Sequence, residues 1–246
     1  TLLASCGRDK SVWLWEYTHS SSSSTESENE FDCIAVLHGH EGDVKCVTFA
    51  PSNDQFGDGE DVLISGSYDD SIRLWAEDGG EWYCACVLNK DGAHIGTVWS
   101  VAAAPGGVRL VSASADRSLC VWRCYLKDDD NHNNNNNNNN NGDGSYKCVG
   151  QLKDAHLREI YSVHCAPSRA GHGRIASGGA DDAIHIYREV MGGTSHAPKF
   201  ALDVARPSAH VGDVNCVRWH PRDGSLLASA GDDGAVKLWR YNCSQK

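Results

Sequence analysis

Apolar and polar residues alternate along this chain in short runs, and each run is bounded by Asp, Gly, Ser or Pro. The segment 44–50 reads Val-Lys-Cys-Val-Thr-Phe-Ala and is closed by Pro51. Alternation with a period of two places every second side chain on one face, as in a β-strand with one buried side. No long stretch has the 3.6-residue period of a helix. The pattern therefore predicts an all-β protein built from short antiparallel strands.

One unit recurs five times, and each copy contains an Asp that is followed six residues later by an aromatic residue. The second copy, 63–75, reads Leu-Ile-Ser-Gly-Ser-Tyr-Asp-Asp-Ser-Ile-Arg-Leu-Trp. A Ser stands four residues before the Asp in every copy, and a His precedes four of the copies. The Asp residues occupy positions 9, 69, 116, 181 and 233, and the copies end at Trp15, Trp75, Trp122, Tyr187 and Trp239.

This unit resembles the WD repeat, which forms four-stranded blades of a β-propeller. Successive Asp residues are 60, 47, 65 and 52 positions apart, more than the roughly 40–45 residues of one blade, so we expect inserted loops. Two polar segments, near 18–30 and 127–145, fit this expectation; the second contains an uninterrupted Asn run over 133–141. Because neither can bury apolar surface, both are predicted to be disordered insertions between the third and fourth strands of their blades.

The repeated Ser, His and Asp residues could suggest a catalytic triad, but an enzyme needs one such site and this chain has four. We expect a structural network in which Asp69 accepts a hydrogen bond from His40, and Ser65 bridges His40 to the indole N–H of Trp75. The equivalent sets are His94, Ser112, Asp116 and Trp122; His156, Ser177 and Asp181, with Tyr187 in place of Trp; and His210, Ser229, Asp233 and Trp239.

Charge and cysteine placement exclude several classes of function. The formal net charge of −11 argues against a nucleic-acid partner, because an acidic chain repels phosphate. No apolar run reaches the roughly 20 residues of a membrane-spanning helix, and no secretory signal is visible. The eleven cysteines are scattered without a C-x-x-C pair, and the twelve histidines lack metal-ligand spacing. We therefore expect buried free thiols in a reducing cytosol, with no metal and no cofactor.

An ordered set of finer motifs narrows the resemblance. The segment 6–16 reads Cys-Gly-Arg-Asp-Lys-Ser-Val-Trp-Leu-Trp-Glu and looks like the third blade of the WD-repeat protein of the cytosolic iron–sulfur assembly machinery. The further matches to that family follow in the same order at 33–37 with 43–45, 67–71, 96–100, 160–163, 181–184 and 213–217. They cover nearly the whole chain outside the two insertions.

The resemblance implies a single WD-repeat domain over 1–246, in a family whose propeller has seven blades. About four and a half blades are then present, because the first two blades and the start of the third are absent. The chain opens on Thr1 inside a predicted strand, which agrees with a missing upstream part. The two open sheet edges left in this way would be prone to aggregation.

The same resemblance implies a non-enzymatic scaffold that helps insert iron–sulfur clusters into cytosolic and nuclear apoproteins. The expected partners are a small acidic adaptor, a large helical-repeat subunit and client apoproteins, and the expected location is cytoplasmic, with the nucleus as a second option. Three alternatives stay open: a substrate receptor of a ubiquitin ligase or a chromatin-associated scaffold, a propeller enzyme, and a metal or cluster carrier built on the cysteines. A propeller enzyme needs one non-repeated acid–base cluster, and none is visible in the sequence.

Four residues at predicted turns are candidates for partner binding. Arg8 matches a rim arginine that the family links to complex assembly, and an Arg beside a turn can form a fork to a partner carboxylate. Without the resemblance, a solvated turn residue would be the simpler interpretation of Arg8. Lys10 and Tyr68 lie at equivalent turns, and Arg117 follows Asp116 on the same predicted rim.

Overall fold

The computed structural model describes residues 1–19, 29–50, 62–89, 94–124, 146–167 and 173–242. Within these ranges the chain forms eighteen β-strands and no helix, so the all-β prediction is confirmed. The described part of the chain accordingly has no helix long and apolar enough to cross a membrane.

The strands form five antiparallel sheets in chain order, and three of these sheets have four strands. These three sheets consist of β4 (Val44–Ala50), β5 (Val62–Ser67), β6 (Ile72–Asp78) and β7 (Glu81–Leu88); of β8 (Val98–Ala103), β9 (Arg109–Ser114), β10 (Leu119–Cys124) and β11 (Tyr146–Leu152); and of β12 (Ile160–Cys165), β13 (Ile175–Gly179), β14 (Ile184–Thr194) and β15 (Ala197–Arg206).

The first and last sheets have three described strands each. They consist of β1 (Leu2–Cys6), β2 (Ser11–His19) and β3 (Asn29–His38), and of β16 (Val214–Trp219), β17 (Leu226–Gly231) and β18 (Val236–Arg240). Ser5 on β1 occupies the position of Ser65 on β5, so β1 corresponds to a second strand of the repeat. The first sheet therefore lacks a first strand among the described residues, and the last sheet lacks a fourth.

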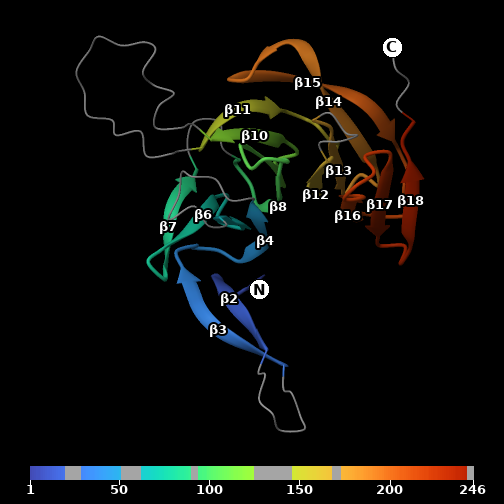
Figure 1. Cartoon of the computed structure of the whole chain (residues 1–246). Helices are drawn as coiled ribbons and strands as arrows, with labels where there is room; N and C mark the ends of the chain where they lie inside the picture. Colours follow the sequence, from blue (N-terminus) through green and yellow to red (C-terminus); the bar gives the residue numbers. More distant parts are fainter. Residues whose placement is uncertain (20–28, 51–61, 90–93, 125–145, 168–172, 243–246) are drawn as a thin grey trace, which may run out of the picture.

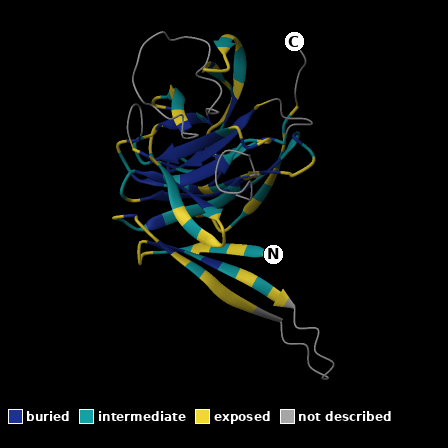
Figure 2. Cartoon of the chain, turned by 60° about the vertical axis from the view of Figure 1, so that its left-hand side comes forward, coloured by how far each residue is buried: buried dark blue, intermediate teal, exposed yellow. Residues whose placement is uncertain are grey.

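The five sheets follow one another around an arc, as the blades of a propeller do (Figure 1). The first strands of neighbouring sheets contact each other along its inner side, β4 with β8, β8 with β12, and β12 with β16. Apolar side chains fill the spaces between sheets: Trp75 and Leu63 of the second sheet pack against Val12 and Leu14 of the first. Figure 2 shows the resulting buried interior and the more exposed first sheet.

A tight turn joins the second and third strands of every sheet, as the repeat predicted. The carboxylate of the repeated Asp accepts the backbone N–H of the residue two positions later, for example Ser71 N–H to Asp69 at 3.0 Å and Ser118 N–H to Asp116 at 2.9 Å. The residue after the Asp is left-handed in all five turns, with φ between 62° and 70° at Lys10, Asp70, Arg117, Asp182 and Gly234. The Asp side chain thus replaces a backbone acceptor and stabilises an uncommon conformation.

The predicted insertions lie largely outside the described residues, which omit 20–28 and 125–145. The two gaps fall between β2 and β3 and between β10 and β11, the third and fourth strands of their units. Disorder is the wrong expectation at both ends of the first segment. Thr18 pairs with Glu30 and His19 with Asn29, so the β2–β3 hairpin extends further than the polar composition indicated.

Inter-sheet packing leads to a stability prediction at Gly178 on β13. A Cβ added there would lie 2.6 Å from Cγ1 of Val214 and 3.0 Å from Cγ1 of Val217, two valines that are 0 % exposed. We expect Gly178→Ala to lower the free energy of unfolding by about 1–3 kcal/mol, measured by urea denaturation, because the neighbouring sheet has no room to move. Gly7→Ala is the control, since its Cβ would lie 3.5 Å from Asp9. An equal loss at both positions would contradict tight packing at Gly178.

Candidate functional site

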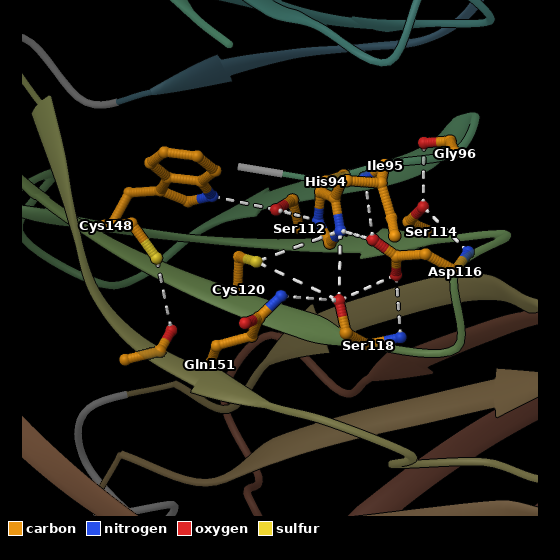
Figure 3. A network of polar contacts seen from close by, with 12 residues as sticks. His94, Ile95, Gly96, Ser112, Ser114, Asp116, Ser118, Cys120, Cys148 and Gln151 are labelled. Atoms are coloured by element: carbon orange, nitrogen blue, oxygen red, sulfur yellow. Dashed lines mark hydrogen bonds and ion pairs between the residues drawn. The ribbon is translucent and has the colours of Figure 1, made fainter. Parts of the chain in front are cut away.

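The third sheet shows the repeated polar network in detail (Figure 3). His94 precedes β8; its Nδ1 lies 3.0 Å from Oδ2 of Asp116 and its Nε2 lies 2.7 Å from Oγ of Ser112. The indole N–H of Trp122 donates to the same Ser112 oxygen at 2.8 Å. The backbone N–H of Ile95 donates to Oδ2 of Asp116 at 3.0 Å. One network therefore ties the connection before β8 to the β9–β10 turn and to the aromatic residue of β10.

The same contacts recur in three other sheets. His40, His156 and His210 lie 2.8–2.9 Å from Asp69, Asp181 and Asp233, and each lies 2.7 Å from its serine, Ser65, Ser177 or Ser229. The indole N–H groups of Trp75 and Trp239 donate to Ser65 and Ser229 at 2.9 and 2.8 Å. In the first sheet the Trp15 indole donates to Ser5 at 3.0 Å.

The fourth sheet departs from the repeat at its aromatic residue. The hydroxyl of Tyr187 donates to the carbonyl oxygen of Ala155 at 2.6 Å, so it binds the connection before β12 and not Ser177. Nδ1 of His185 lies 2.7 Å from the same carbonyl, and its ring stacks on that of His156 at a centroid distance of 4.1 Å. The sequence identified the Tyr substitution but gave no sign of this replacement contact.

The network holds its Asp residues charged. Burial raises the pKa of Asp69, but hydrogen bonds from Ser71, Glu41 and His40 outweigh it and bring the pKa to about 2. Burial lowers the pKa of His40, an effect that the Asp69 contacts only partly oppose. Ser65, Ser112 and Ser177 are 0 % exposed and already hydrogen bonded. Such hydroxyls do not meet a substrate, so the geometry favours a structural network over nucleophilic catalysis.

The network also shapes one edge of the propeller, which we call the Asp rim: the second-to-third-strand turns and the connections between sheets. The N–H of the residue after each His donates to the Asp, which fixes the backbone while the side chain projects outward. Ile95, Leu157 and Val211 at this position are 88 %, 83 % and 83 % exposed. The same position on three successive sheets thus presents one exposed apolar side chain each to the surroundings.

The four candidate partner-binding residues lie on the Asp rim. Arg8 and Lys10 are exposed in the β1–β2 turn. The pKa of Asp43 is lowered mainly by its hydrogen bond from Lys45, and the charges of Arg8 and Lys10 lower it further. Tyr68 is 62 % exposed and its N–H donates to the carbonyl oxygen of Asp43 at 2.8 Å. The structure thus gathers Arg8, Lys10 and Tyr68 around Asp43. Arg117 instead forms an exposed ion pair with Asp154 at 2.8 Å.

Sequence reasoning missed a second set of rim residues, Lys45, Trp99, Tyr161 and Asn215. Each is the second residue of the first strand of its sheet, at a β-bulge where the register with the next strand shifts. Bulges re-aim side chains and are common next to functional sites. We call these four residues the bulge row. The sequence offers one sign of this set, because each of the four residues directly follows the apolar residue that begins the first strand of its sheet. The position recurs from sheet to sheet, but the type of side chain does not.

The cysteines form no metal site among the described residues, where no three His, Cys, Asp or Glu side chains are placed to share an ion. None of the ten described cysteines forms a disulfide bond. Burial raises the pKa of Cys46 and Cys165 to about 12, which disfavours the thiolate that binds metals. The expectation of buried thiols fits Cys120 and Cys124 but is wrong for Cys33, which is exposed on the edge strand β3.

Comparison with known proteins agrees with this geometry. The family model "WD domain, G-beta repeat" matches residues 31–76, 84–123 and 203–240, which together make up half of the chain. The chain belongs to the WD40-repeat family.

Two fungal relatives are both named "Probable cytosolic iron-sulfur protein assembly protein 1". The Chaetomium globosum protein is 31 % identical over 98 % of this chain and 61 % of its own length, and the Neurospora crassa protein is 34 % identical over 97 % and 63 %. The Aedes aegypti "Probable cytosolic iron-sulfur protein assembly protein Ciao1" is 37 % identical over 70 % of this chain and 48 % of its own length. The WD40 chain thus spans less than two thirds of each of these relatives.

The network of the third sheet generates a stability prediction. Ser112→Ala removes the acceptor of the Trp122 indole and the partner of His94 Nε2, leaving two buried polar groups unsatisfied. We expect a loss of about 2–4 kcal/mol in the free energy of unfolding. Ser5→Ala is the matched control, because Ser5 is exposed and, within the described part of the chain, its hydroxyl hydrogen-bonds only to the Trp15 indole. Equal losses in the two variants would show that the His contact contributes nothing.

The carboxylates generate a pH prediction. The pKa of Asp69 is about 2 in the folded protein against an ordinary 3.8. A lowered folded pKa contributes stability that is present above 3.8 and lost as the pH falls toward 2. Asp69→Asn should therefore show a shallower acid-induced loss of unfolding free energy across that window, measured by urea denaturation at several pH values. Asp78→Asn, at the exposed β6–β7 turn, is the control and should keep the parental slope.

Proposed function

We propose that this chain is the greater part of a scaffold that helps insert iron–sulfur clusters into cytosolic and nuclear apoproteins. The observation that carries the proposal is the collinear similarity to relatives named cytosolic iron–sulfur assembly proteins, at 31–34 % identity over 96–98 % of the chain in three fungal proteins. The name of these relatives also supports a cytoplasmic location. We propose the nucleus as a second site of action.

A binding role without catalysis fits the physical character of the Asp rim. Its repeated Ser, His and Asp side chains hydrogen-bond to one another, and its outward side chains vary from sheet to sheet. Such a surface suits contacts with several proteins. We propose that these are the small acidic adaptor, the large helical-repeat subunit and client apoproteins, with the iron–sulfur cluster as cargo and not as a resident cofactor.

We also propose that further repeats of the same polypeptide close the arc into a seven-bladed ring. Leu3 is 49 % exposed, whereas the equivalent Leu63 is 0 % exposed against the preceding sheet. At the other end Val236 and Leu238 are 75 % and 70 % exposed, whereas the equivalent Ile184 and Ile186 are 3 % and 5 % exposed. Both end faces are therefore built like inter-sheet faces, and the greater length of the relatives supplies candidates to cover them.

Partner binding is proposed at Arg8, with Lys10 and Tyr68 beside it around Asp43 and Arg117 further along the rim. An exposed arginine at a turn can form a two-point hydrogen bond to a carboxylate, which suits an acidic adaptor. The left-handed backbone at Lys10, with φ of 66°, fixes the direction in which this turn presents its side chains.

Affinity purification tests this proposal. The protein is tagged at its own locus, in parental form and as Arg8→Glu, and co-purifying proteins are quantified by mass spectrometry. We expect the adaptor and helical-repeat subunits with the parental protein and about tenfold less of them with Arg8→Glu, because the reversed charge repels an acidic partner. Arg222→Glu, an exposed arginine in the β16–β17 connection at the opposite edge, is the control and should retain both subunits.

Recovery of a ubiquitin-ligase or chromatin complex in place of iron–sulfur components would overturn the proposed function and leave the propeller. Retention of both subunits by Arg8→Glu would instead remove only the role of Arg8.

A further inference from the structure

A cavity of about 320 Å³ lies on the inner side of the arc, where the first strands of four successive sheets meet. Its walls come from β4, β8, β12 and β16, together with Ala104 and Pro105 after β8. Most of the lining side chains are apolar or small, and no Asp or Glu of the described residues lines it. None of the His, Ser and Asp residues of the repeated polar network lines it either, so the cavity is separate from the Asp rim.

Arg218 on β16 brings a positive charge to this cavity. Its Nη1 donates to Oγ of Ser162 at 3.1 Å and to the carbonyl oxygen of Val217 at 2.8 Å, which ties the guanidinium to β12 and β16. Within the described part of the chain no ion pair includes Arg218, and its Nε and Nη2 have no hydrogen-bond partner. The guanidinium therefore keeps charged donors available for a ligand.

Two neutral groups add hydrogen-bond donors to the same walls. Nδ1 of His164 accepts the backbone N–H of Trp219 at 3.0 Å. Burial and the nearby Arg218 lower the pKa of His164 to about 4, so at neutral pH the imidazole carries its one proton on Nε2. Ser100 is 6 % exposed; its Oγ accepts the N–H of Val163 at 3.2 Å, and its O–H has no acceptor among the described residues. A buried O–H is costly unless something in the cavity accepts from it.

The propeller fold does not require basic residues at these positions. Thr48, Ala102, His164 and Arg218 are each the fifth residue of the first strand of their sheet. The strands β4 and β8 form equally well with Thr and Ala there, so His and Arg on the neighbouring strands β12 and β16 are free to serve another purpose. One cation and two neutral donors, without a carboxylate of the described residues, favour an anionic ligand.

We propose that this cavity binds a small oxyanion of the phosphate or sulfate class, held by the guanidinium of Arg218, the Nε2–H of His164 and the O–H of Ser100. A tetrahedral oxyanion fits better than a halide, because its oxygens accept from several donors at once and a guanidinium donates to two of them in a fork. The ion bridges β8, β12 and β16 and so links three sheets from the inside of the arc. This role is independent of the iron–sulfur function.

An NMR titration of the ¹⁵N-labelled full-length protein with inorganic phosphate tests the proposal at neutral pH, with sodium chloride holding the ionic strength constant. The reporter is the backbone N–H of Trp219, because it donates to the imidazole that contacts the ion. We expect its resonance to shift to saturation with phosphate, and chloride to bind at least about tenfold more weakly, because a monatomic ion cannot accept in a fork. A shift that never saturates, or an equal response to chloride, would overturn the proposal without requiring any variant.

Variants locate the site. Arg218→Gln removes the charge and should weaken phosphate binding at least about tenfold. Ser100→Ala keeps the charge but removes a donor and should weaken binding about threefold. Arg222→Gln makes the same charge change at an exposed arginine that does not line the cavity, and should bind phosphate as the parent does. Resonances far from the cavity report whether each variant keeps its fold. Equal weakening by Arg222→Gln would mean that phosphate follows the net charge of the chain and has no site in the cavity.

Discussion

This propeller depends on one constraint, which is that its buried polar groups must find hydrogen-bond partners. An imidazole packed between two sheets must find partners for both nitrogens, and an indole N–H beside it must find an acceptor. One Asp and one Ser meet all these needs in the third sheet, where His94, Asp116, Ser112 and Trp122 bind one another within 3.0 Å. Removing Ser112 leaves both Nε2 of His94 and the indole N–H of Trp122 unpaired, so the sheet, its turn and the incoming connection depend on one another.

This constraint fixes the backbone of the Asp rim and leaves its side chains free. The Asp accepts N–H groups from its own turn and from the residue after the His, as at Ser118 and Ile95. Both bonds use only the backbone N–H of the residue that donates, so any residue except proline can supply them. Glu41 and the exposed Ile95, Leu157 and Val211 show this freedom, and the bulge row shows it on the inner side of the rim. Partner specificity is therefore free to vary without a cost in folding.

Features that recur in every repeat could be predicted from the sequence, whereas contacts between residues of different repeats could not. The strand class, the Asp turns and the His–Ser–Asp partners follow from residues that recur at fixed spacing. The Tyr187 bond to Ala155 and the row from Lys45 to Tyr161 join residues of different repeats, and spacing within one repeat carries no information on such contacts. Hairpin pairing also extended β2 and β3 into polar sequence, because backbone hydrogen bonds need no apolar side chain.

The end faces show that the stability of each sheet resides partly in its neighbour. Leu3 and Leu63 have the same place in the repeat, yet only Leu63 is covered, because only its sheet has a preceding one. In repeat architectures stability is close to a sum of nearest-neighbour terms, so opening starts at uncovered ends. Lys45, Trp99 and Tyr161 lie on β4, β8 and β12, in the three sheets that have neighbours on both sides. The bulge row therefore lies where the arc is best supported, and its geometry does not depend on how the ends are covered.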